Sequence, residues 1–245
     1  MPEISFDLHF VYAVAIIAFA YLVRGVAGFG SGLIAIPLLV LDGVPLTTAV
    51  PMVVLLDYLA STSQGLKNRS AIVWREILPL LPFTLIGVLT ALYLFKTLDA
   101  ALLTKVMGGL IIVYAIYSLL APQPHEGHSR LWAIPAGGLG GLVGTLFGTG
   151  GPFYVVYLHL RGLDKTAFRA TFATMFMLDG ANRLIGYLAT GLYNLESGLL
   201  IALMLPVMAI SLYIGGHIHL RINQELFKRG ISVLLIGSGT LLLFK

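Results

Sequence analysis

Four ionisable side chains lie deep inside apolar stretches of the sequence: Arg24, Asp57, Asp179 and Arg183. Each costs roughly 2.5–3.5 kcal/mol at the centre of a membrane helix, so such groups should face the protein interior and pair. Asp179 and Arg183 are four residues apart and can pair on one helix face, with Asn182 beside them. Arg183 or Arg24 could attract an anion, and Asp57 or Asp179 could carry a coupling proton. The alternative is a structural ion pair, with Arg24 snorkelling to the membrane surface.

Two glycine-rich runs, residues 25–32 and 137–151, are the second chemical feature. Backbone that leaves the helix inside a bilayer survives only where protein or a watery cavity satisfies it. A half-helix that starts there offers unpaired N–H groups and the positive end of its dipole to an anion, and glycine permits close approach. Paired interruptions at matching points of two repeats are typical of a transporter's substrate site. The alternative for such glycines is close helix packing.

These patterns predict a site for a small anionic substrate. Its expected residues are Gly28, Gly30, Ser31, Gly32, Gly148, Thr149, Gly150, Gly151, Asn182 and Arg183, with Asp57 and Asp179 as proton-coupling candidates.

The composition indicates which kind of protein must position these residues. The chain has 245 residues, of which 58% are hydrophobic and 11% charged, against about 45–50% and about 25% in soluble domains. This excludes a soluble enzyme, a nucleic-acid binder and a disordered chain. The chain has no cysteine, and its His125-Glu-Gly-His128 segment lacks the metalloprotease spacing. We therefore expect no metal and no cofactor.

The apolar runs predict an all-α polytopic membrane protein with about eight membrane segments. A spanning helix needs about 20 apolar residues, and six runs of this kind are present: 45–66, 76–95, 101–120, 166–190, 197–216 and 226–244. Residues 8–41 and 131–160 are too long for one span and contain the glycines, so each is expected to be a broken helix or a pair of short helices.

The chain also carries an internal repeat. Gly28-xxx-Gly32 before Pro37 resembles Gly144-xxx-Gly148 before Pro152, and Leu81-Pro82 resembles Leu205-Pro206. Residues 1–121 and 131–245 are therefore predicted to be homologous halves joined by a polar linker at 122–130. Each half would hold three full spans and one glycine-broken segment.

The lysines and arginines of the loops indicate how the chain is oriented in the membrane, because such residues are enriched in cytoplasmic loops. If each broken segment crosses once, eight of these cations lie on one side and five on the other; if each returns to its starting side, the division is ten and three. The second count favours returning segments and inverted halves. Both counts place the C-terminus outside.

The residues that carry a family resemblance are 25–39 and 43–56 in the first half, and 140–152 and 168–172 in the second. Through them the chain resembles the TauE/SafE family of membrane anion transporters, the sulfite exporter family. The resemblance implies a secondary transporter of the cytoplasmic membrane that moves sulfite, sulfoacetate or a related organosulfonate by alternating access. The expected partners are the small anion and the lipid bilayer, not nucleic acid, and homo-oligomerisation is left open. An anion channel and, more remotely, an intramembrane lipid-modifying enzyme are the alternatives.

Overall fold

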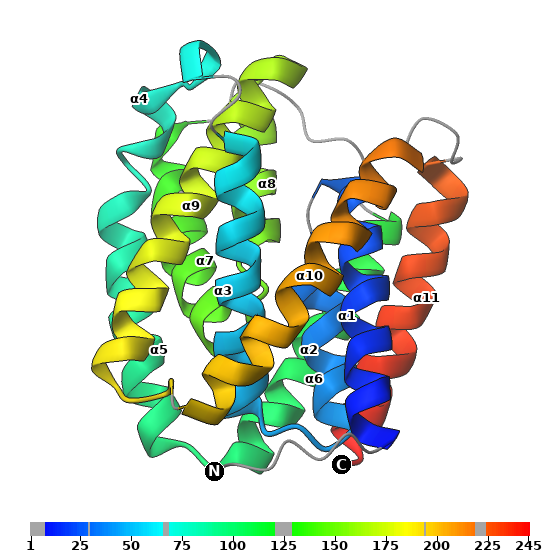
Figure 1. Cartoon of the computed structure of the whole chain (residues 1–245). Coiled ribbons are helices and arrows are strands. Elements are labelled where there is room, and N and C mark those ends of the chain that lie inside the picture. The colour runs from blue at the N-terminus through cyan, green and yellow to red at the C-terminus, as the bar shows by residue number, and fades with distance from the viewer. Residues whose placement is uncertain (1–7, 29, 66–68, 121–128, 194, 219–223) are drawn as a thin grey trace. The chain divides into compact units, whose positions relative to one another are not determined.

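The computed structural model describes residues 8–28, 30–65, 69–120, 129–193, 195–218 and 224–245. Over these ranges all regular secondary structure is helical, as the composition predicts (Figure 1). Those before residue 121 are α1 (Leu8–Ala27), α2 (Ser31–Leu41), α3 (Leu46–Gly65), α4 (Trp74–Ile77), α5 (Leu81–Thr97) and α6 (Ala100–Leu120), with the 3-10 turn η1 (Arg69–Ala71). Those after residue 128 are η2 (Arg130–Trp132), α7 (Ala133–Phe147), α8 (Gly151–Leu160), α9 (Lys165–Ala189), α10 (Leu195–Ile218) and α11 (Gln224–Leu243).

Among the described residues, three helices are long and apolar enough to cross a membrane: Leu8–Ala27, Ala100–Leu120 and Ser197–His217. Shorter apolar helices cover Ser31–Leu41, Leu46–Thr62, Leu81–Thr97 and Arg229–Leu243. The run expected at 76–95 divides instead, because α4 ends at Ile77 and α5 begins at Leu81. Pro79 lies in the turn between them, and a proline has no N–H with which to continue the helical hydrogen-bond ladder.

Both glycine-rich segments are broken helices, as predicted. The first break lies between α1, which ends at Ala27, and α2, which begins at Ser31, and the second covers residues 148–150 between α7 and α8. The helices after the breaks, α2 and α8, have 11 and 10 residues. At 1.5 Å per residue each is about 15 Å long, half the thickness of a hydrocarbon core.

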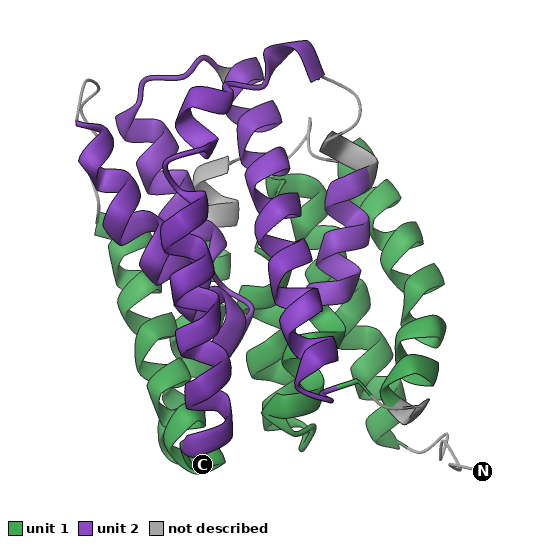
Figure 2. Cartoon of the chain, turned by 90° about the vertical axis from the view of Figure 1, so that its left-hand side faces the viewer, with its two compact units in different colours: residues 1–53, 98–121, 193–245 green, residues 54–97, 122–192 purple. Residues whose placement is uncertain are grey.

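The chain forms two compact units (Figure 2). Unit 1 consists of residues 1–53, 98–121 and 193–245, and unit 2 of residues 54–97 and 122–192. Each unit therefore takes helices from both sides of the polar linker at 122–130.

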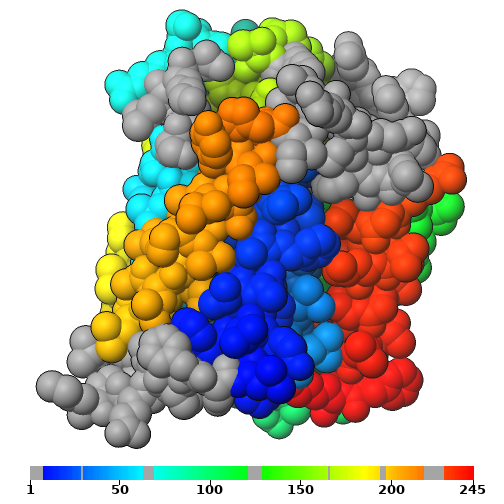
Figure 3. Space-filling view, turned by 45° about the vertical axis from the view of Figure 1, so that its right-hand side comes forward, coloured from blue at the N-terminus to red at the C-terminus, as the bar shows by residue number. Residues whose placement is uncertain are grey.

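In unit 1, α1 packs on α10 and α6 packs on α11. Figure 3 shows the surface on which α1 lies between α10 and α11. The helices touch through glycines: a Cβ on Gly25 would lie 2.7 Å from the Leu212 carbonyl oxygen, and one on Gly108 would lie 2.7 Å from that of Gly239. Gly108 also faces Leu242, whereas Gly239 faces Ile112, so α6 and α11 run antiparallel.

In unit 2, α5 packs along α7, and α9 contacts α5 and α8. The start of α9 is fixed by its N-cap, where the Asp164 carboxylate accepts hydrogen bonds from the N–H groups of Thr166 (2.8 Å) and Ala167 (3.0 Å). Such a cap satisfies backbone donors that have no partner within the helix. It determines where the helix that carries Asp179 and Arg183 begins.

Both broken segments return to the end of their unit from which they start. In unit 1, His9 near the start of α1 lies 3.1 Å from Asp42, which follows α2. In unit 2, Arg130 before α7 and Arg161 after α8 bind the same carboxylate, that of Glu76. Of the two routes that the sequence leaves open, the described residues take the returning one.

Candidate functional site

The second glycine break lies in unit 2 and is set by a left-handed glycine. Gly148 has φ 66°, and its N–H donates to the Gly144 carbonyl at 2.9 Å, which ends α7. Residues with a Cβ rarely adopt this conformation. The chain re-enters a helix at Gly151, with Pro152 in the first turn of α8, where a proline is well accommodated because its missing N–H would have no helical partner. Thr149 is 7% exposed.

Arg183 reaches this break from α9 and is 1% exposed. Its Nε donates to Asp179 Oδ1 at 3.1 Å, and its Nη2 donates to the other oxygen of Asp179 and to the Gly140 carbonyl at 3.2 Å. The pairing expected from the i, i+4 spacing is therefore confirmed. A two-pronged contact of this kind holds a guanidinium plane in one orientation, and the Phe176 ring lies 5.9 Å from the guanidinium carbon.

The glycines of α7 serve two purposes on two faces of the helix. A Cβ on Gly137 would lie 2.7 Å from the Leu80 carbonyl oxygen, and one on Gly141 would meet that of Thr84, so both pack against α5. A Cβ on Gly144 would instead overlap the guanidinium of Arg183, and one on Gly150 would lie 2.5 Å from its Nη2. Helix packing thus explains Gly137 and Gly141, whereas Gly144 and Gly150 leave the space that Arg183 occupies.

Three further predicted residues lie in unit 2. Gly151 begins α8 and would meet Phe176 at 3.4 Å if it carried a Cβ. Asn182 is half-buried, and its side chain is turned about 100° from that of Arg183 around the helix axis. Asp57 is buried, with 4% exposure, in the part of α3 that belongs to this unit.

The first break lies in unit 1 and also has a buried arginine beside it. Gly28 and Gly30 have φ values of 87° and 97°, and a Cβ on either would meet no atom within 4 Å. Arg24 is 3% exposed, and its Nη1 donates to Ser31 Oγ at 3.0 Å. The alternative of a snorkelling Arg24 is therefore wrong, because the side chain spans the break towards the first residue of α2. Gly32 is buried in the same helix turn.

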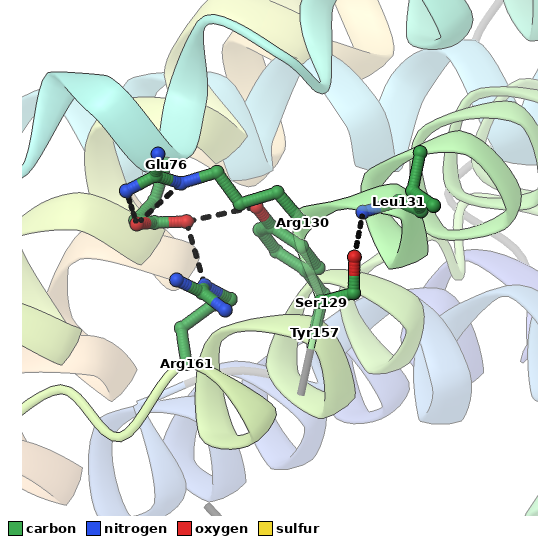
Figure 4. Close-up of polar contacts among 6 residues, drawn as sticks. All are labelled: Glu76, Ser129, Arg130, Leu131, Tyr157 and Arg161. Carbon is green, nitrogen blue, oxygen red and sulfur yellow. Dashed lines mark hydrogen bonds and ion pairs between the residues drawn. The ribbon is translucent and has the colours of Figure 1, made fainter. Parts of the chain in front are cut away.

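A further polar cluster in unit 2 was not predicted as a site (Figure 4). Glu76 is 3% exposed and accepts hydrogen bonds from Arg130 Nε (3.2 Å), Arg130 Nη2 (3.1 Å), Tyr157 Oη (2.9 Å) and Arg161 Nε (2.9 Å). Ser129 caps the turn that holds Arg130 by accepting a hydrogen bond from the N–H of Leu131 at 3.2 Å. We call Glu76, Arg130, Tyr157 and Arg161 the Glu76 cluster.

The electrostatics of this cluster favour the charged carboxylate. Burial by itself raises the pKa of Glu76, but the hydrogen bonds from Arg161, Arg130 and Tyr157 outweigh it and hold the pKa below the ordinary value of 4.5. Glu76 is therefore ionised at neutral pH, which suits a carboxylate that accepts from two guanidinium groups.

Little in the sequence points to this cluster. Arg130 and Arg161 have the pattern of loop cations, and Glu76 lies at the edge of an apolar run. Its partners are 54, 81 and 85 residues away, so no local spacing joins them. Within the described residues no group of three or more His, Asp or Glu side chains could hold a metal ion.

Comparison with known proteins gives a consistent family. The family described as "Sulfite exporter TauE/SafE" matches residues 13–242. A protein of Comamonas testosteroni named "Probable inner membrane transporter protein TsaS" is 27% identical over 193 residues, which are 77% of this chain and 80% of that protein. A "Probable sulfite/organosulfonate exporter TauE" of Cupriavidus necator is 25% identical over 226 residues, 89% of this chain and 87% of the relative. No solved structure matches significantly.

Proposed function

The chain belongs to the sulfite exporter TauE/SafE family of membrane transporters, and on this basis we propose that it is a secondary transporter of a small sulfur-containing anion. It is a transporter rather than an enzyme, as its family is. The proposed cargo is sulfite, sulfoacetate or a related organosulfonate. The proposed process is alternating access across the inner membrane, which is the membrane that the name of the relative from Comamonas testosteroni specifies.

The observation that carries this proposal is a buried arginine beside each glycine break. In unit 1, Arg24 of α1 donates to Ser31 at the start of α2, and in unit 2, Arg183 lies against Gly150. A buried guanidinium attracts an anion strongly because the surrounding dielectric is low, and its donors match the oxygen geometry of a sulfonate as they match a carboxylate. Within each unit, the helix that follows the break, α2 or α8, would add the positive end of its dipole.

Asp179 supplies the proposed link to protons. Its carboxylate now occupies two donors of Arg183. A proton on Asp179 would remove the competing charge, so the guanidinium would attract the cargo anion instead. Loss of that proton would restore the pair and release the anion. Asp57, which is buried in the same unit, is the second candidate for this role.

We infer about eight membrane segments arranged as inverted halves. Each half has one returning segment and three further long helices, so each crosses an odd number of times. The antiparallel contact of α6 with α11 supports this inference, because the last helices of two inverted halves run in opposite directions. The positive-inside rule then places Arg130 and Arg161 on the cytoplasmic side and the C-terminus outside.

Uptake of labelled anions into proteoliposomes tests the proposal. We expect saturable uptake of sulfite or an organosulfonate that responds to an imposed proton gradient. Arg183→Gln should reduce it by about 100-fold, since removing a charged partner of a bound ion costs about 3 kcal/mol. Arg75→Gln, which removes an exposed cation of α4, is the matched control and should leave uptake unchanged. Flux that does not saturate would indicate a channel, and equal uptake by both variants would contradict the site.

A further inference from the structure

Glu76 lies where the two ends of the α7–α8 segment meet. One of its oxygens accepts from Arg130, just before α7, and the other accepts from Tyr157 and Arg161, at the end of α8. Glu76 itself belongs to α4. One buried carboxylate therefore ties both ends of the broken segment to a third element (Figure 4).

The break gives this contact its mechanical importance. Residues 148–150 are not helical, so the helical hydrogen-bond ladder does not fix the angle between α7 and α8 there. The opposite end of the pair, where the Glu76 cluster lies, must then help to set that angle. Any change of angle moves Gly150 relative to Arg183, whose Nη2 would lie only 2.5 Å from a Cβ at that position.

The first broken segment has a different contact at the corresponding place. There His9 and Asp42 share a 3.1 Å contact, and the His9 side chain is 70% exposed. The Glu76 carboxylate, in contrast, is 3% exposed and accepts four charge-assisted or hydroxyl hydrogen bonds, and such bonds are among the strong ones when buried.

We propose that Glu76 is a positioning residue that holds the α7–α8 segment closed and thereby places the Gly148–Gly150 break against Arg183. It does not touch the cargo. Its importance for transport rests on the proposed function, whereas its effect on the break can be measured without transport.

The experiment uses the absence of cysteine from the chain. Thr149→Cys creates a single thiol at the break, where the native side chain is 7% exposed. Its reaction rate with a membrane-impermeant methanethiosulfonate is measured in liposomes, with and without Glu76→Gln. The glutamine amide turns its own N–H donors towards the N–H donors of Arg130 and Arg161. Loss of one charge-assisted hydrogen bond shifts the equilibrium between the closed and open segment by about tenfold. We expect the labelling rate to rise about tenfold, and less for Glu76→Asp, which keeps the charge.

Two controls separate positioning from general loosening. Arg75→Gln alters the neighbouring residue of the same helix and should leave the labelling rate unchanged. Ser31→Cys reports on unit 1, and its labelling rate should not respond to Glu76→Gln. An unchanged rate at Thr149→Cys, or an equal rise at Ser31→Cys, would overturn the proposal.

A milder variant covers the case in which Glu76→Gln does not fold. Tyr157→Phe removes one 2.9 Å hydrogen bond and leaves both ion pairs, so we expect about threefold faster labelling at Thr149→Cys. No increase would overturn the proposal. In uptake assays, Glu76→Gln should raise KM about tenfold while Arg75→Gln does not. If the wild-type protein carries none of the tested anions, the proposed function fails, but the labelling result still decides the role of Glu76.

Discussion

The buried Asp179–Arg183 pair allows stability and transport to be separated by a double-variant cycle. Asp179 and Arg183 are 0% and 1% exposed, so either single change leaves one charge buried without its partner. We expect Asp179→Asn or Arg183→Gln to destabilise the protein by about 3–5 kcal/mol. For a chain of this size that corresponds to a fall of roughly 6–20 °C in melting temperature. The double variant buries no unpaired charge at this position and should recover most of the loss.

Thermal scans of the purified protein in detergent measure these shifts, and proteoliposome uptake measures activity on the same preparations. The double variant should be stable yet inactive, because it lacks the guanidinium that would attract the anion. A double variant as unstable as the two single changes added together would refute the argument from unpaired charge. A stable double variant with normal uptake would refute the assignment of Arg183 to the cargo.

Further predictions concern single positions. Gly144→Ala should lower the melting temperature because its Cβ would overlap the Arg183 guanidinium, whereas Gly138→Ala, with no atom within 4 Å of its Cβ, should be neutral or stabilising by up to about 1 kcal/mol. Gly30→Ala meets no neighbour but keeps a φ of 97°, so thermal scans should show a cost of about 1–2 kcal/mol from backbone strain alone. The stability difference between the wild type and Glu76→Gln should be constant at neutral pH. Because the folded pKa of Glu76 is lowered, this difference should shrink only as the pH falls below 4.5 towards that pKa; a decline between pH 8 and 6 would contradict it.

Much of the local structure could be predicted because it depends on short spacings. The i, i+4 interval of Asp179 and Arg183 gives a contact on any helix, and the structure confirms it. Long apolar runs predict helices, and the glycine clusters predict breaks, both of which are present, one between α1 and α2 and one between α7 and α8. The extent of each break was harder to predict. Most of the run at 137–151 remains helical, because glycine weakens a helix that packing against α5 can still hold.

Composition and periodicity are enough to predict a helical membrane protein with two interrupted segments and a few buried charges, because they reflect the solvent that each residue meets. How α7 uses its glycines depends on the packing of the folded chain, in which Gly137 lies on α5 and Gly144 lies beside Arg183. The return of both broken segments likewise depends on long-range contacts, those of Asp42 and Glu76. These features join residues dozens of positions apart, and the side-chain types alone do not specify which distant partner a buried carboxylate will meet.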